Sequence, residues 1–135
     1  LMNNFMDVES FDIMLNHAAD LKKYIQEADC ITLHIPKSDK NINFFDKEKL
    51  SWMKNNAVLI NTARGPIVDE KALYKELSGH RIKAAFDVYW KEPYDGKLKE
   101  FFPEYFYMTP HVASTCAGFL IGCRHSLDEL ILEII

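Results

Sequence analysis

One stretch decides the fold: Ala57-Val58-Leu59-Ile60-Asn61-Thr62-Ala63-Arg64-Gly65-Pro66-Ile67-Val68-Asp69. Its first four residues are an apolar run that, with Asn61, predicts a strand over 57–61, and Asp69 has the position of a helix cap. Val68 before this cap and Leu73 inside the expected helix have the spacing of a hydrophobic staple. The stretch therefore predicts a strand, a loop and a helix in succession.

The same alternation precedes this stretch. A helical pattern after Asp20, the expected cap, leads into a strand-like run over 30–35. A second helix is expected to begin at Asp46, with Phe45 and Leu50 as its staple. Both segments have the order of helix followed by strand.

The alternation also continues after the stretch. Gly79 is expected to end the helix that Asp69 caps, and strand-like residues follow over 82–88 and 105–109. A last helix is expected from about Ser114. Its apolar stripe consists of Phe119, Cys123, Leu127, Leu130, Ile131 and Ile134.

The predicted class is α/β with a doubly wound parallel sheet, because the strands over 30–35, 57–61 and 82–88 are continuous apolar runs. Ligands of such sheets bind beyond the carboxyl ends of the strands. Four segments follow those ends and are expected to meet at one edge. They are Pro36, Thr62-Ala63-Arg64-Gly65, Asp87 and Thr109-Pro110-His111.

Composition argues against several classes of protein. The net charge of -4 and the scattered basic residues do not resemble a surface that binds nucleic acid. Cys30, Cys116 and Cys123 form no CxxC pair, so free thiols are expected. No charged-then-apolar leader is visible and the run 117–123 is too short to cross a bilayer, so we expect a cytoplasmic protein without a membrane partner.

Several ordered motifs resemble those of the D-isomer-specific 2-hydroxyacid dehydrogenases, a family that includes D-lactate, phosphoglycerate and glyoxylate/hydroxypyruvate enzymes. The motifs are Ala28 to Pro36, Leu59 to Asp69, Ala85-Phe86-Asp87-Val88 with Glu92-Pro93, and Thr109-Pro110-His111-Val112-Ala113. The resemblance covers roughly 19–113. It implies part of a Rossmann-type domain that binds NAD, and an enzyme that interconverts a D-2-hydroxy acid and a 2-oxo acid by hydride transfer.

The resemblance implies a catalytic set of Arg64, Glu92 and His111. Arg64 would bind the substrate carboxylate, which a guanidinium can hold with two parallel hydrogen bonds. His111 would donate the proton during reduction and accept it during oxidation, because imidazole exchanges protons near neutral pH. Glu92 would orient the imidazole and stabilise its protonated form.

The resemblance also implies a set of cofactor contacts, with Asp87 against the nicotinamide. The set is Ile35, Pro36, Thr62, Ala63, Arg64, Asp87 and His111. No metal is expected, since His34 has no Cys, His or carboxylate at ligand spacing.

Two features of the family are missing from the chain. No Gly-x-Gly-x-x-Gly turn is present, and no acidic residue ends a strand at the ribose position unless Asp7 takes that role. The chain also begins at Leu1, without an initiator Met. We therefore expect a fragment: a partial cofactor domain over 1–112 and, over 113–135, a helix that returns to a substrate domain. The fragment would be inactive without its N-terminal portion. NAD versus NADP and the identity of the acid stay open.

Other interpretations stay open beside this one. Arg64 can be a solvated surface charge, His111 an ordinary loop residue, Glu92 an exposed carboxylate and Asp87 a turn cap. The chain as a whole can be a non-catalytic dinucleotide-sensing module. It can also be an interaction domain that forms a homo-oligomer through its sheet edge. The retention of Arg64, Glu92 and His111 argues against a pure binding role.

Overall fold

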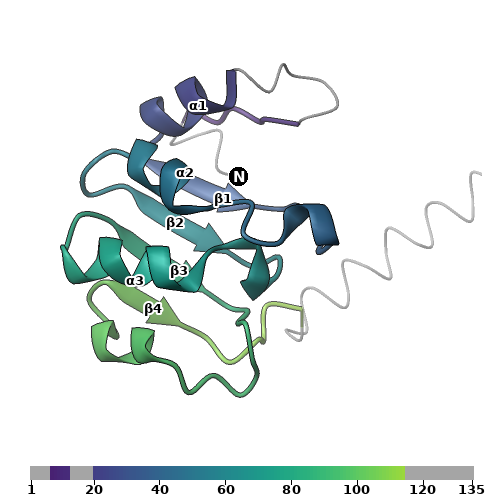
Figure 1. Ribbon diagram of the computed structural model, residues 1–135, viewed down its shortest axis with the longest axis vertical. Coiled ribbons are helices and arrows are strands. Elements are labelled where there is room, and N and C mark those ends of the chain that lie inside the picture. The colour runs from purple at the N-terminus through teal and green to yellow at the C-terminus, as the bar shows by residue number, and fades with distance from the viewer. Residues whose placement is uncertain (1–6, 13–19, 115–135) are drawn as a thin grey trace, which may run out of the picture.

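The computed structural model describes residues 7–12 and 20–114, which form one parallel sheet with helices packed on it (Figure 1). The expected last helix, Cys116 and Cys123 lie outside these residues. The strands are β1 (Cys30–Leu33), β2 (Val58–Asn61), β3 (Lys83–Phe86) and β4 (Phe106–Met108). The α-helices are α1 (Leu21–Glu27), α2 (Lys47–Trp52) and α3 (Glu70–Ser78), and the short 3-10 helices are η3 (Asp39–Asn41), η4 (Gly65–Ile67) and η5 (Lys97–Phe101).

The strands lie in the order β1-β2-β3-β4 and all pairings are parallel. The register aligns Leu33 with Asn61, Asn61 with Phe86, and Phe86 with Met108. These four residues are the last of their strands, so the four following loops start level with one another. The prediction that these loops meet at one edge of an α/β sheet is therefore confirmed.

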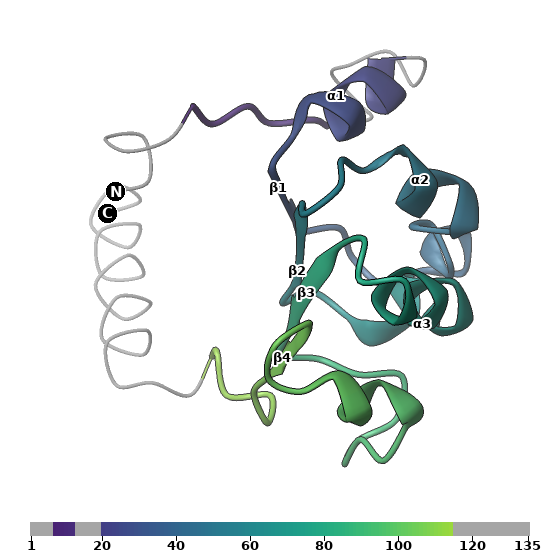
Figure 2. The ribbon, with the colours of Figure 1, turned by 90° about the vertical axis from the view of Figure 1, so that its left-hand side faces the viewer.

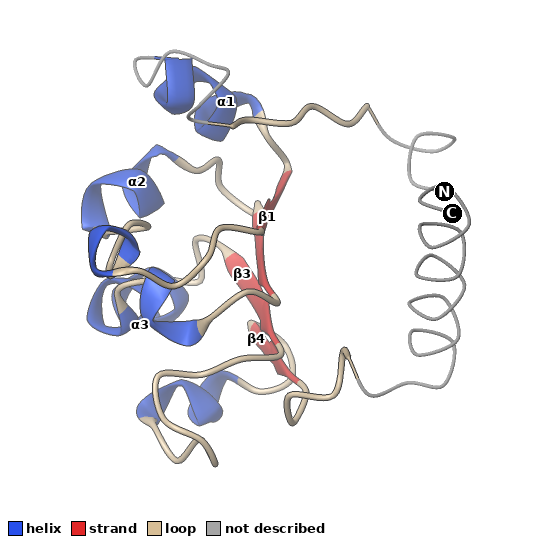
Figure 3. Ribbon diagram, turned by 90° about the vertical axis from the view of Figure 1, so that its right-hand side faces the viewer, coloured by secondary structure: helices blue, strands red, loops and turns tan. Residues whose placement is uncertain are grey.

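The three α-helices lie on one face of the sheet, as the two side views show (Figures 2 and 3). Burial along the central strand β2 alternates in response. Leu59 and Asn61 are fully buried, whereas Val58 and Ile60 are only half-buried. Within the described residues the sheet thus has one face covered by helices, although most residues of its strands are apolar.

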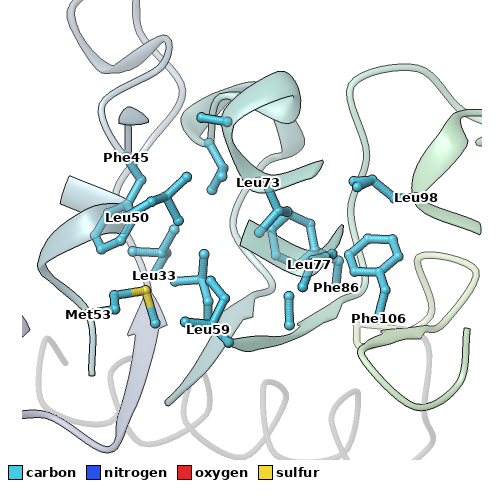
Figure 4. Packing of buried hydrophobic residues seen from close by; sticks show 14 of the residues in the cluster. Leu33, Phe45, Leu50, Met53, Leu59, Leu73, Leu77, Phe86, Leu98 and Phe106 are labelled. Atoms are coloured by element: carbon cyan, nitrogen blue, oxygen red, sulfur yellow. The ribbon is translucent and has the colours of Figure 1, made fainter. Parts of the chain in front are cut away.

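The core fills the space between the sheet and these helices (Figure 4). Phe45 and Leu50, the expected staple of α2, are buried and lie beside each other. Val68 and Leu73, the expected staple of α3, are fully buried as well. The side chains that the sequence selects for the core therefore lie in it.

Two of the three expected helix caps are confirmed. The Asp46 carboxylate accepts a hydrogen bond from the Lys49 amide (2.9 Å), and the Asp69 carboxylate accepts one from the Ala72 amide (3.0 Å). The prediction for Asp20 is wrong: its backbone is already helical (φ -80°, ψ -19°) and its side chain makes no cap bond. An N-cap residue has a non-helical backbone, which lets its side chain accept a hydrogen bond from an amide two or three residues onward. The helical backbone of Asp20 does not allow this contact.

Gly79 follows the last residue of α3 as expected, but it is not the left-handed residue of the helix end. Gly79 has φ -81° and ψ 0°, whereas the next residue, His80, has φ 53°. The strands are also shorter than expected. β1 ends at Leu33 rather than at residue 35 because its ladder partner in β2 ends at Asn61.

Arg81 joins α2 to α3 at the edge of the core. Its guanidinium donates to the Glu76 carboxylate and to the carbonyl oxygens of Met53 and Leu50, each over 2.5 Å. Leu50 lies in the last turn of α2 and Met53 directly follows the helix, a region where carbonyls have few amide partners. The Leu50 carbonyl also accepts a hydrogen bond from the Met53 amide (3.2 Å). One side chain thus satisfies a helix end that is some thirty residues away in the sequence.

Candidate active site

The loop that follows β2 is shaped by Asn61, a fully buried polar residue. Its Oδ1 accepts a hydrogen bond from the Ala63 amide (3.1 Å), and its Nδ2 donates to the Arg64 carbonyl (3.0 Å). Asn side chains often bond to the backbone two or three residues onward in this way and so fix a turn. The sequence interpretation did not assign Asn61 a role, although an Asn at a strand end signals such a turn.

Gly65 brings this loop against the loop that follows β3. A Cβ atom at Gly65 would lie 2.1 Å from the carbonyl carbon of Tyr89 and 2.4 Å from the amide nitrogen of Trp90. The indole of Trp90 also donates to the Val68 carbonyl over 2.7 Å. The absence of a side chain at Gly65 is therefore what lets the two loops touch.

Glu92 and His111 form a hydrogen bond across this edge, with 2.8 Å between Oε2 of Glu92 and Nδ1 of His111. The other carboxylate oxygen of Glu92 accepts a hydrogen bond from the Tyr89 amide (3.1 Å). The hydrogen bond with His111 is the main reason why the pKa of Glu92 lies below its usual value, and the hydrogen bond from the Tyr89 amide lowers it further. The pair is open to solvent, since each side chain is about two fifths exposed: 40% for His111 and 39% for Glu92.

Asp87 is buried directly after β3, with 5% of its surface exposed. Its carboxylate accepts hydrogen bonds from the Thr109 hydroxyl and from the amides of Val112 and Ala113, the last two over 2.9 Å. Burial by itself would raise the pKa of Asp87. The hydrogen bonds and the nearby His111 outweigh burial and lower it. Asp87 therefore binds the same loop that carries His111.

An open hollow of about 570 Å³ lies between the loops that follow β1 and β2. It is lined by His34, Ile35, Pro36, Lys37, Ala63 and Arg64. Four of the predicted cofactor residues thus share one cavity. His34 and Lys37 were not predicted for the site, although both directly flank Ile35-Pro36.

The other predicted site residues lie elsewhere along the same edge. Thr62 is exposed and is not in the lining of the hollow. Asp87, Glu92 and His111 are grouped by their hydrogen bonds at the ends of β3 and β4. The guanidinium of Arg64 is exposed and donates to the Ala63 carbonyl over 2.6 Å. The edge thus presents a cation at the hollow and, at the ends of β3 and β4, a carboxylate hydrogen-bonded to an imidazole.

Two features are absent from residues 7–12 and 20–114. These residues contain no group of three or more His, Cys, Asp or Glu arranged to hold a metal ion. Among the same residues, no helix has the length and apolar character needed to cross a bilayer.

Comparison with known proteins places the same features in a family context. Residues 2–113 match the model described as D-isomer specific 2-hydroxyacid dehydrogenase, NAD binding domain. The chain is 43% identical over 75 residues to a D-3-phosphoglycerate dehydrogenase of Methanocaldococcus jannaschii, covering 55% of the chain and 14% of that relative. It is 38% identical over 114 residues to a glyoxylate reductase of Thermofilum pendens, covering 82% of the chain and 32% of that relative.

A solved structure is similar as well. The D-isomer specific 2-hydroxyacid dehydrogenase of Xanthobacter autotrophicus, in complex with NADPH and MES, superimposes with a TM-score of 0.67 and 27% identity. The match covers 76% of the chain and 33% of that structure. The chain thus spans about a third or less of the length of these relatives.

Proposed function

Since the chain belongs to the D-isomer specific 2-hydroxyacid dehydrogenase family, as its sequence motifs predicted, we propose that it forms the C-terminal part of an NAD-dependent oxidoreductase. The reaction is the interconversion of a D-2-hydroxy acid and a 2-oxo acid. The Glu92–His111 pair is the observation that carries this proposal.

In the proposed reaction His111 is the acid and base. Glu92 holds Nδ1 of the ring, so proton exchange with the substrate takes place at Nε2. A nicotinamide bound at this edge would supply the hydride for the reduction, and His111 would supply the proton to the carbonyl oxygen. Glu92 orients the imidazole ring for this transfer through its hydrogen bond with Nδ1. Glu92 is then a positioning residue for His111.

Arg64 binds the substrate carboxylate in this proposal. The side chain is exposed at the edge of the hollow and its structural partner is one carbonyl oxygen. A carboxylate is a stronger partner for a guanidinium than a carbonyl because both groups are charged and two hydrogen bonds form in parallel. Binding of the acid would therefore draw Arg64 from the Ala63 carbonyl toward the substrate.

The hollow fits one side of a dinucleotide. Ile35, Pro36 and Ala63 offer apolar contacts, and the neighbouring Lys37 and Arg64 are cations suited to anionic groups. We propose cofactor contacts at Ile35, Pro36, Thr62, Ala63, Arg64, Asp87 and His111. The chain has no Gly-rich turn for the diphosphate, so the isolated 135-residue chain is expected to bind NADH weakly and to show no turnover.

The test is substitution of His111→Gln in the protein as encoded, with Arg64→Lys as a second variant. Reduction of glyoxylate, hydroxypyruvate and pyruvate is followed by the loss of NADH absorbance. His111→Gln should lower kcat by roughly 10²–10⁴-fold, the contribution typical of a general acid. Arg64→Lys should mainly raise KM, because Lys keeps the charge but not the paired hydrogen bonds.

Three results would contradict parts of the proposal. Unchanged reductase activity in His111→Gln would remove its role as acid. Tight NADH binding without turnover of any of these 2-oxo acids would favour a dinucleotide-sensing role. Full turnover by the isolated chain would refute the need for the missing cofactor half.

A further inference from the structure

His111 has an unusual backbone conformation for its residue type. Its φ of 56° lies in the left-handed region. For residues with a Cβ this region is less favourable than the right-handed helical one. Such conformations persist where surrounding contacts impose them, and they cluster at functional sites. Around His111, the contacts that impose this conformation come from Asp87.

The carboxylate of Asp87 binds the chain on both sides of His111. Before His111, the Thr109 hydroxyl donates to Oδ1. After His111, the Val112 amide donates to Oδ1 and the Ala113 amide donates to Oδ2, each over 2.9 Å. A single side chain therefore brackets the imidazole-bearing residue with three hydrogen bonds.

In these contacts Asp87 is the more rigid partner, and the loop that carries His111 is the more mobile one. Asp87 is 5% exposed, directly follows β3, and its amide donates to the Asn61 carbonyl of β2 (3.1 Å). His111, Val112 and Ala113 are all exposed. A buried residue that directly follows β3 and is bonded to β2 moves less than an exposed loop. The Asp87 carboxylate therefore fixes the position of the loop, rather than the loop fixing Asp87.

Tyr89 provides a second attachment from the same segment. Its hydroxyl lies 2.7 Å from the Thr109 carbonyl and 2.9 Å from the Phe86 carbonyl, and its amide donates to Glu92. The segment after β3 therefore fixes both the backbone of the His111 loop and the carboxylate that orients the His111 ring.

We infer that Asp87 is a positioning residue that holds His111 in its left-handed conformation and so keeps the imidazole in register with Glu92. This inference rests on the proposed function only for the role of His111. It differs from the expectation that Asp87 acts mainly as a contact to the nicotinamide. A positioning role requires its partner Thr109 to matter as well, whereas a direct cofactor contact does not.

The first experiment measures the loop itself in the 135-residue chain. Amide hydrogen exchange of Val112 and Ala113 is followed by NMR in the wild type and in Asp87→Asn. An Asn amide group turns a donor toward one of these amides, so exchange there should accelerate by about 10–100-fold, the equivalent of one charge-assisted hydrogen bond. The amide of Leu59 in β2 should be unchanged and serves as the control for intact folding.

The second experiment uses Thr109 and so avoids any change at Asp87. Thr109→Val removes the hydroxyl and keeps the shape, whereas Thr109→Ser keeps the hydroxyl. Measured in the protein as encoded, because the isolated chain is expected to show no turnover, Thr109→Val should lower kcat by about 10–100-fold with the Kd for NADH unchanged, since one hydrogen bond to a carboxylate is lost. Thr109→Ser should restore kcat to within about 2-fold of wild type.

The outcomes separate the inference from the proposed function. Unaltered exchange of Val112 and Ala113 in Asp87→Asn would overturn the inference, as would equal kcat in Thr109→Val and Thr109→Ser. A large rise in the Kd for NADH in Asp87→Asn without faster exchange would establish the cofactor contact instead. Faster exchange in Asp87→Asn, together with no reduction of any 2-oxo acid by the protein as encoded, would support the positioning role of Asp87 and refute the proposed function.

Discussion

Substitution of Gly65 by Ala is expected to destabilise the fold where the Arg64 loop meets the Glu92 loop. The added Cβ would lie 2.1 Å from the Tyr89 carbonyl carbon and 2.4 Å from both the Tyr89 oxygen and the Trp90 nitrogen. Non-bonded carbon atoms prefer about 3.5–4.0 Å, so the backbone must retreat by more than about 1 Å. Crowding of this kind costs about 1–3 kcal/mol or more, because backbone cannot rotate away as a side chain can.

The expected change in the free energy of unfolding follows from two opposing effects. Replacing Gly by Ala restricts the unfolded chain and by itself stabilises the native state by about 0.4–1 kcal/mol. The net loss for Gly65→Ala is then about 1–2 kcal/mol. With a urea dependence of about 1–3 kcal/mol per molar, the unfolding midpoint should fall by about 0.5–1 M.

Gly79→Ala is the matched control in the same assay. A Cβ at Gly79 would make only ordinary contacts, 3.6 Å to the Lys75 carbonyl oxygen, and the backbone there (φ -81°, ψ 0°) suits any L-residue. Its urea midpoint should rise by a few tenths molar, since only the effect on the unfolded chain remains. Equal midpoints for Gly65→Ala and wild type, or a loss in Gly79→Ala as large as in Gly65→Ala, would refute the reasoning.

Further expectations concern the helix caps, the partly buried Arg81 and the pH dependence of stability. Asp69→Ala should lower the free energy of unfolding in urea by about 1 kcal/mol, whereas Asp20→Ala should change it by less than about 0.5 kcal/mol. Of these two residues, Asp69 makes a cap bond and Asp20 does not. Arg81→Met should lower the free energy of unfolding by about 2–4 kcal/mol, because the carbonyls of Leu50 and Met53 lose the guanidinium as a donor. Arg81→Lys should recover only part of this loss, since an ammonium group lacks the fork of donors. Full recovery in Arg81→Lys would mean that the positive charge alone matters. The lowered pKa of Asp87 stabilises the fold above its unfolded pKa of about 3.9, and this contribution is lost as the pH falls through the folded pKa. The stability difference between wild type and Asp87→Asn should therefore narrow below about pH 4 in acid titrations; a constant difference would argue against this linkage.

Local sequence signals predicted much of the fold and part of the site. Asp46 and Asp69 cap their helices because a carboxylate three residues before an amide can reach it once the helix forms. Asp20 shows the limit of the same rule, since its residue type is suitable but its backbone is helical. The ends of the strands were predicted less well because they depend on where the neighbouring strand ends.

The sequence by itself determined the elements, their order and the residue types at the active edge, because these depend on contacts within a few residues and on the apolar pattern. Only the tertiary structure decided how those residues act on one another. Asp87 binds amides that follow it by 25 and 26 positions, Arg81 binds a carbonyl 31 positions away, and Gly65 is needed because another loop passes over it. Contacts between residues so distant in the chain arise only when the parallel strands pair and bring their carboxyl ends level, and this pairing is a property of the whole sheet.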